Sequence, residues 1–134
     1  MLLGKLTLDA IPLHEPIIVA ALSGAGLLII EATAVTPHGR ISPDDLGLWS
    51  DAHQEALAPV IRAMRRHSPI KIAIQLAHAG RKASTHLPWE RGESAPLAAD
   101  EGAWQTLAPS AIPWRPTSPA PRAMDAADMA RTLA

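Results

Sequence analysis

Residues 71–82 read KIAIQLAHAGRK, an apolar run that changes into polar and basic residues at its end. The apolar part is predicted to be a β-strand, because it is short, continuously apolar and preceded by Pro69. Its far end carries an amide at Gln75, an imidazole at His78 and a guanidinium at Arg81. Polar groups at the carboxyl end of a buried strand are typical of α/β folds, which bind ligands at that edge.

Upstream, a second apolar run covers residues 27–35, LLIIEATAV, and a helix is predicted between the two runs. Ser50 is a suitable N-cap for that helix, and apolar residues then recur at helical spacing, at Leu57, Val60, Ile61 and Met64. A helix that joins two apolar strands favours a parallel sheet with a right-handed crossover. The sequence therefore predicts the α/β class, with strands buried on both faces.

The first twenty residues fit this pattern less simply. Residues 5–13 alternate around an Asp-Ala turn, which predicts a short hairpin, and residues 17–20 are predicted to form another buried strand. Only six residues separate Ala20 from Leu27, whereas a parallel crossover needs about a dozen. Either these two strands are not adjacent and parallel, or a helix is missing between them.

Composition excludes several classes of protein. The 134 residues are 48% hydrophobic with a net charge of −1, which is globular rather than disordered and offers no basic stripe for nucleic acid. The sequence has no cysteine, and its apolar runs are far shorter than the roughly 20 residues that span a membrane. We find no secretion signal and expect a cytoplasmic protein. The length is also too short for a closed eightfold (β/α) barrel, which takes about 250 residues.

Residues 83–123 break the alternation of strands and helices, because seven of the thirteen prolines fall there. A long segment without regular structure is more often a functional loop or lid than a linker. After it, Asp125 and Asp128 have the spacing of a helix start, which predicts a helix through Met129 and Leu133.

Five stretches in order resemble the Old Yellow Enzyme family of FMN-dependent NAD(P)H oxidoreductases. They are GAGLLIIEATAV at 24–35, PHGRIS at 37–42, LGLWSD at 46–51, IQLAHAGRKA at 74–83 and APSAI at 108–112. The stretch 74–83 is the most specific of them. RKAS at 81–84, with PWE at 88–90, is most similar to the bacterial xenobiotic-reductase branch.

The resemblance implies a partial (β/α)8 TIM barrel, about the first three βα units with an N-terminal hairpin. Residues 1–134 would then be an N-terminal fragment of an FMN-binding barrel, with 83–123 as a loop within it. It implies FMN as cofactor and NADPH or NADH as reductant. The substrate would be a small unsaturated carbonyl or nitro compound, whose β-carbon receives a hydride from flavin N5. No catalytic or metal-binding residue is expected in this chain.

The same resemblance assigns two cofactor contacts. Gln75 would meet the pyrimidine edge of the flavin, which suits an amide that both donates and accepts, and Ala32 would be the small residue beneath the ring. We interpret His78 as a structural histidine bonded to a loop carbonyl, and Arg40 and Arg81 as braces for loops. The tryptophans of the proline-rich loop, Trp89, Trp104 and Trp114, would pack that segment.

The sequence also departs from the family pattern. It lacks the Pro-Met step and the flavin-tuning Cys or Thr after the first strand, the His pair that binds substrate, the flavin-binding arginine and the phosphate-binding loops. We therefore expect a truncated, internally deleted piece that is weakly active or inactive alone. The alternative is a non-catalytic gene fragment or deletion product that self-associates through an open barrel interior.

Overall fold

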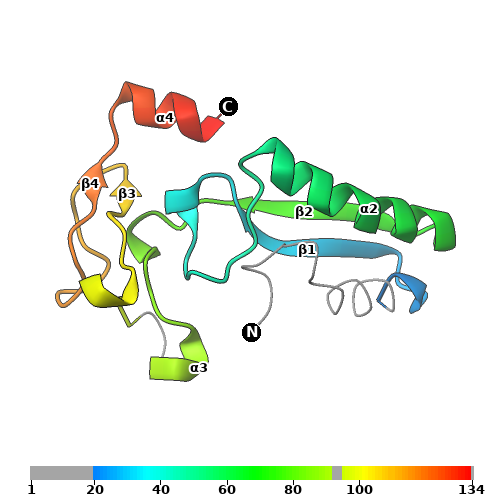
Figure 1. The fold of residues 1–134 in the computed structure, drawn as a ribbon, viewed down its shortest axis with the longest axis horizontal. Helices are drawn as coiled ribbons and strands as arrows, with labels where there is room; N and C mark the ends of the chain where they lie inside the picture. Colours follow the sequence, from blue (N-terminus) through cyan, green and yellow to red (C-terminus); the bar gives the residue numbers. More distant parts are fainter. Residues whose placement is uncertain (1–19, 92–94, 134) are drawn as a thin grey trace.

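The computed structural model describes residues 20–91 and 95–133. Its central unit is β1 (Leu27–Ala34), α2 (Asp51–His67) and β2 (Lys71–Ala77), in that order (Figure 1). The two strands pair in parallel from the pair Leu27–Lys71 to the pair Ala34–Ala77. The predicted parallel strand–helix–strand unit is thus confirmed.

The segment before β1 differs from its prediction. The hairpin at residues 5–13 and residues 17–19 of the predicted strand lie outside the described residues. Ala20, the last residue of that strand prediction, is helical, and the helical turn continues through residue 22. The carbonyl of Ala21 accepts a hydrogen bond from the Ser68 hydroxyl at 2.6 Å, which ties this turn to the end of α2.

The core lies between α2 and the strands. Met64 and Val60, one helical turn apart on α2, are buried together with Ala21 and Ile70, and Leu28, Ile61 and Ile72 pack against them. Met64 is fully buried. The core is small and aliphatic because the sequence contains no Phe or Tyr, so its packing depends on the close approach of one helix to two strands.

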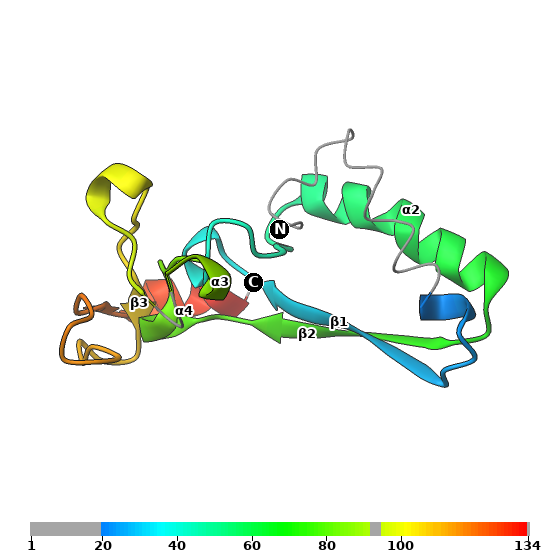
Figure 2. The ribbon, with the colours of Figure 1, turned by 90° about the horizontal axis from the view of Figure 1, so that it is seen from below.

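Helix α2 covers only one face of the β1–β2 pair (Figure 2). Ile30 is buried on that side, and Leu28 packs against the core. Leu27 and Ile29 alternate with them and remain 53% and 60% exposed. The prediction that the strands are buried on both faces is therefore wrong: within the described chain, no second layer covers the face that would be a barrel interior.

The sequence predicted no regular structure in the proline-rich region, but the region does contain short helices and strands. It contains α3 (Pro88–Arg91), the 3₁₀ turn η4 (Ala99–Glu101) and a parallel pair of two-residue strands, β3 (Leu107–Ala108) and β4 (Arg122–Ala123). Two further 3₁₀ turns, η2 (Pro37–Gly39) and η3 (Gly80–Lys82), lie between the sheet and these loops. All of them gather beyond the carboxyl ends of β1 and β2 (Figure 1).

Helix α4 (Ala126–Leu133) begins as the spacing of its two aspartates predicts. The Asp125 carboxylate accepts the Asp128 N–H at 2.8 Å, and the Asp128 carboxylate accepts the Asp125 N–H at 3.1 Å. Arg122 donates two hydrogen bonds to the buried Asp128 carboxylate, at 2.7 and 2.9 Å, and Arg131 donates another. The hydrogen bonds from Arg122 contribute most to holding the pKa of Asp128 far below its usual range, and the bond from the Asp125 N–H adds to this effect.

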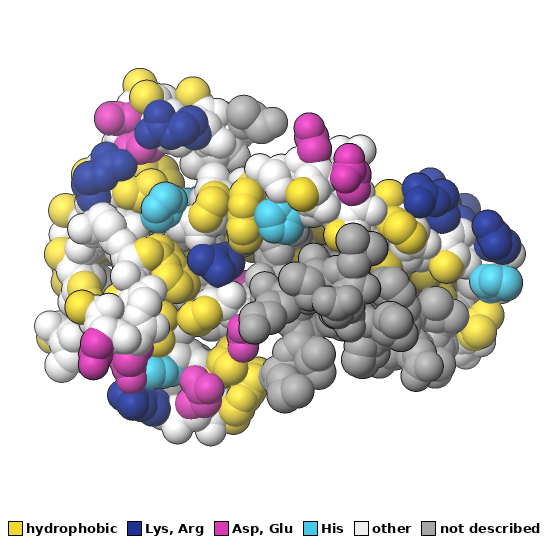
Figure 3. Space-filling view, viewed as in Figure 1, with side chains coloured by type: hydrophobic (Ala, Val, Ile, Leu, Met, Phe, Trp, Pro, Cys, Tyr) yellow, Lys and Arg dark blue, Asp and Glu magenta, His cyan; other side chains and the backbone are white. Residues whose placement is uncertain are grey.

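The basic cluster at the end of α2 is a solvated helix end, as expected from the sequence. Arg62, Arg65 and Arg66 are exposed, and Figure 3 shows blue side chains over this part of the molecule. Cations in the last helical turn suit the negative end of the helix dipole. Among the described residues, no helix is both long and apolar enough to cross a membrane.

Met64→Ala should be the most damaging single truncation in the core. It removes a fully buried side chain with little room for the helix to relax, and we expect a loss of about 2–5 kcal/mol in the free energy of unfolding. Met129→Ala, at a half-exposed position on α4, is the matched control and should change it by less than about 0.5 kcal/mol. Urea denaturation measures both, and equal effects would contradict this account of the core.

Asp128→Asn should loosen α4 selectively and change its response to acid. Because the pKa of Asp128 is lowered in the folded chain, its contribution is present at neutral pH and is lost as the pH falls below the usual range of a carboxyl group. We expect the helicity of α4 in the wild type to fall on acidification. In the variant this helicity is lower at neutral pH and changes less as the pH falls. Amide NMR shifts of residues 126–133 between pH 7 and about pH 2 provide the measurement.

Candidate functional site

A β-bulge sets the geometry of the strand ends. The register of β1 and β2 shifts between Ile30 and Ala32, so that Glu31 has no partner across the ladder. Ile30 pairs with Ile74, and Ala32 then pairs with Gln75. Strict alternation would place Ala32 on the same face as Ile30, beneath α2. The extra residue moves it to the opposite face, beside Gln75.

The two residues expected to contact the cofactor are therefore neighbours. Ala32 and Gln75 form a register pair close to the carboxyl ends of their strands, on the face that α2 does not cover. The Gln75 side chain is exposed and Ala32 is half-buried. A small side chain next to a free amide leaves room for a flat ring to approach the sheet, and it offers one donor and one acceptor at the ring edge.

His78 is structural, but not in the predicted way. Its Nδ1 accepts the Gly80 N–H at 3.1 Å instead of donating to a carbonyl, so the ring proton sits on Nε2. Nε2 is buried and has no hydrogen-bond partner among the described residues. Burial, and then the nearby charge of His38, lower the pKa of His78, so the ring stays neutral. A Cβ at Gly39 would come within 2.9 Å of the His78 ring, so this packing requires glycine there.

Both loop arginines brace loops, as the sequence suggested. The Arg40 side chain donates to the carbonyls of Pro37 and Pro43, at 3.0 and 2.9 Å, and lies over the rings of Trp49 and Trp104. Arg81 donates to the Ser110 hydroxyl at 3.2 Å.

Of the three tryptophans expected to pack the loop region, only Trp104 is largely covered. Its indole N–H donates to the His38 carbonyl at 3.2 Å. Trp89 and Trp114 are 68% and 44% exposed. The expectation that all three pack this segment is therefore wrong for Trp89, which lies on the surface of α3.

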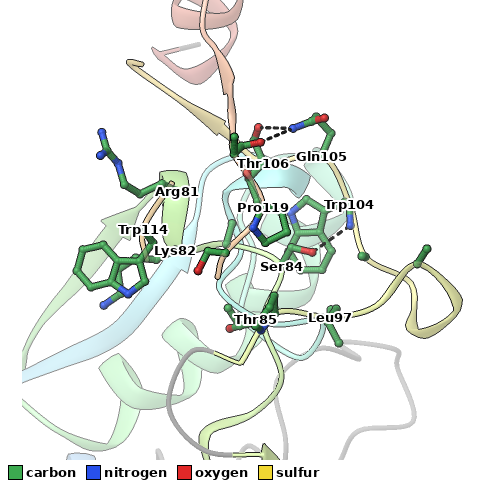
Figure 4. A pocket seen from close by; sticks show the side chains of 16 residues that line it. Arg81, Lys82, Ser84, Thr85, Leu97, Trp104, Gln105, Thr106, Trp114 and Pro119 are labelled. Atoms are coloured by element: carbon green, nitrogen blue, oxygen red, sulfur yellow. Dashed lines mark hydrogen bonds between the residues drawn. The ribbon is translucent and has the colours of Figure 1, made fainter. Parts of the chain in front are cut away.

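The loops beyond the strand ends enclose a cavity of about 250 Å³, which we call the loop cavity. Its walls come from three segments, residues 81–85, 96–106 and 114–120. Figure 4 shows Arg81, Lys82 and Trp114 on one side, and Ser84, Trp104 and Pro119 on the other. Ser84 has a φ of +62°, a left-handed conformation that is strained for a residue with a side chain.

A buried histidine holds two of these walls together. Nε2 of His86 lies 3.1 Å from the Glu101 carboxylate, and Nδ1 lies 3.6 Å from that of Glu90. Glu101 also pairs with Arg91 and accepts the Ala98 N–H, at 2.8 Å each. The Ala98 N–H contributes most to lowering the pKa of Glu101, and the charges of Arg91 and His86 add to it.

Sequence reasoning missed the loop cavity. Ser84, Thr85 and Thr106 are buried around it, yet in the sequence they are isolated hydroxyl residues within a proline-rich stretch. The nearest signal was the length of that stretch, which favoured a functional loop. In the described part of the chain, no group of three or more His, Cys, Asp or Glu side chains could hold a metal ion.

Comparison with known proteins finds relatives both by sequence and by structure. The NADPH dehydrogenase of Geobacillus thermodenitrificans is 40% identical over 121 residues, which is 90% of this chain and 30% of that protein. Morphinone reductase superposes with a TM-score of 0.62 at 25% identity, covering 87% of this chain and 32% of that one. The Old Yellow Enzyme homologue from Zymomonas mobilis superposes with a TM-score of 0.62 at 27% identity, covering 99% and 36%.

This chain thus spans about a third of the length of the relatives it matches. Its parallel strand–helix–strand unit is part of the α/β barrel of the Old Yellow Enzymes, which confirms the predicted fold class. The NADH:flavin oxidoreductase / NADH oxidase family matches residues 15–133, nearly the whole chain. The chain therefore belongs to the NADH:flavin oxidoreductase / NADH oxidase family, a family of oxidoreductases.

Proposed function

We propose that this chain supplies the flavin-facing first strands of an FMN-dependent NAD(P)H oxidoreductase. The register pair of Ala32 and Gln75 carries the proposal. It puts an exposed amide and a small side chain together at the carboxyl edge of a parallel sheet, where α/β folds bind their ligands. Residues 1–134 would be the N-terminal part of the barrel, with 83–123 as its loop region.

Gln75 and Ala32 fit one part of the FMN molecule, its flavin ring. The Gln75 amide can donate to and accept from the pyrimidine edge of the ring, and Ala32 lets the ring lie close to β1. When bound, FMN supplies hydride transfer from N5 to the β-carbon of an activated alkene, such as a small unsaturated carbonyl or nitro compound. NADPH is the reductant that the names of the relatives favour, and such a protein would work in the cytoplasm.

A second candidate is a non-catalytic fragment that self-associates. The observation that favours it is the uncovered face of the sheet, where Leu27 and Ile29 remain more than half exposed. Adjacent apolar side chains of this size at the surface are typical of an interface or an aggregation site. The free edge of a short parallel sheet adds a second opportunity for association.

The role of Gln75 can be tested in a chimera. Residues 24–82 would replace the aligned stretch of the Geobacillus thermodenitrificans relative, and we expect a yellow, FMN-loaded protein. Gln75→Leu in the chimera should weaken FMN binding about tenfold, because two amide hydrogen bonds are lost. Gln54→Leu, at an exposed position on α2, is the control and should leave FMN binding unchanged.

A colourless chimera, or a Gln75→Leu chimera with unchanged FMN affinity, would contradict the proposal. The 134-residue chain by itself should bind FMN weakly or not at all, because its sequence has no counterpart of the family's flavin-binding arginine or phosphate loops. Quenching of flavin fluorescence measures both proteins. A sub-micromolar dissociation constant with one FMN per isolated chain would show that this view of the missing contacts is wrong.

The self-association candidate predicts a species larger than the 14.2 kDa monomer at micromolar concentration. Ile29→Lys should shift it towards the monomer, because a charge would then have to be buried in the contact. Ile112→Lys, at an equally exposed position in the loops, should leave the mass unchanged. Size-exclusion chromatography with light scattering measures this, and a monodisperse monomer with a cooperative thermal transition would exclude the candidate.

A further inference from the structure

The loop cavity is distinct from the Ala32–Gln75 pair, and the proposed function makes no use of it. Its volume of about 250 Å³ approaches the lower end of the range for small-molecule sites, roughly 300–1,000 Å³. Among the described residues, those that line it include two cationic side chains, Arg81 and Lys82, and no Asp or Glu. The described walls therefore carry positive charge that none of their own carboxylates balances.

Neither cation has a carboxylate partner among the described residues. Arg81 and Lys82 are both half-buried, and no ion pair joins either of them to a carboxylate of the described residues. Arg81 has a neutral partner, the Ser110 hydroxyl. The Lys82 ammonium lies 4.8 Å from the centre of the Trp114 ring. Partly desolvated cations without a counter-ion are unfavourable unless an anion joins them.

Two buried hydroxyl groups face the same cavity. Ser84 is 6% exposed, and its hydroxyl oxygen accepts the backbone N–H of Trp104 at 3.0 Å, which leaves its own hydrogen free to donate. Thr106 is 7% exposed, and its hydroxyl makes no hydrogen bond to any described residue. Thr106 lines the same cavity as Ser84. Each hydroxyl can therefore donate to a bound carboxylate.

The remaining walls are flat and apolar. Trp104 and Trp114 line the cavity together with Pro119 (Figure 4). The Trp104 ring is fixed in place, because its indole N–H donates to the His38 carbonyl and Arg40 lies over the ring. The rigid face of Trp104 favours a planar ring, which it contacts in offset or edge-to-face packing.

We propose that the loop cavity binds a small aromatic carboxylate. The carboxylate would accept hydrogen bonds from the Ser84 and Thr106 hydroxyls in the positive field of Arg81 and Lys82. The aromatic ring would pack against the Trp104 indole. The His86–Glu101 contact keeps the η4 side of the cavity closed against the segment that leads to α3.

The experiment uses benzoate as probe and the full 134-residue chain. Two-dimensional NMR of the indole N–H signals follows the titration, and we expect the Trp104 and Trp114 signals to shift with one saturable isotherm, in the millimolar range or tighter. Benzamide has the same shape without the charge and should bind at least tenfold more weakly. Benzoate affinity should also fall as salt is added, because salt screens the two cations.

Two variants locate the site. Lys82→Met should weaken benzoate binding about tenfold, whereas Lys71→Met, at the exposed start of β2, should not. Thr106→Val removes one hydroxyl without changing the shape of the side chain and should weaken binding several-fold. Its control is Thr117→Val, at an exposed position that does not line the cavity.

Equal affinity for benzoate and benzamide would overturn the proposal, as would an equal effect of Lys71→Met and Lys82→Met. Absence of saturable binding up to tens of millimolar benzoate would also overturn it. The comparison of benzoate with benzamide needs no variant, so it holds even where a substitution unfolds the loops. Thermal unfolding of each variant identifies such cases.

Discussion

The unpaired residue in β1 is the constraint on which the candidate site depends. The strands must bury Leu28, Ile30 and Ile72 under one helix, and strict alternation would bury Ala32 with them. The bulge at Glu31 breaks this alternation once, after the core contacts have been made. The core and the ligand edge therefore use opposite faces of the same two short strands. A deletion of Glu31 would restore strict alternation and turn Ala32 towards the core face.

The elements that depend on local pattern were predicted from the sequence. Helix α2 was predicted from the spacing of Val60 and Met64, and the start of α4 from the spacing of Asp125 and Asp128. The pairing of Ala32 with Gln75 was anticipated only through the family resemblance. The bulge that brings it about has no signal in residues 27–35, because Glu31 is compatible with an unbroken strand.

Other features depend on contacts between distant segments, and the sequence does not encode these in any local pattern. Thr106 and Ser84 are 22 positions apart in the sequence, and only the path of the proline-rich loops brings both to one cavity. Residue type alone does not determine the burial of β1: a run of Leu and Ile predicts burial on both faces, but burial of the second face requires a second layer. For His78, the tautomer depends on the Gly80 N–H, which a turn of the backbone supplies.

Helix α4 is attached to the rest of the chain in a different way from α2. Leu133 and Met129 are 88% and 51% exposed, so little apolar burial anchors it, and its start is held by the ion pairs of Asp128 with Arg122 and Arg131. Elements with few buried apolar contacts open with a small free energy, independently of the rest of the molecule. We therefore expect α4 to open locally at a lower free energy than the unit of β1, α2 and β2, so that amide hydrogens of α4 exchange with solvent sooner than those of the two strands.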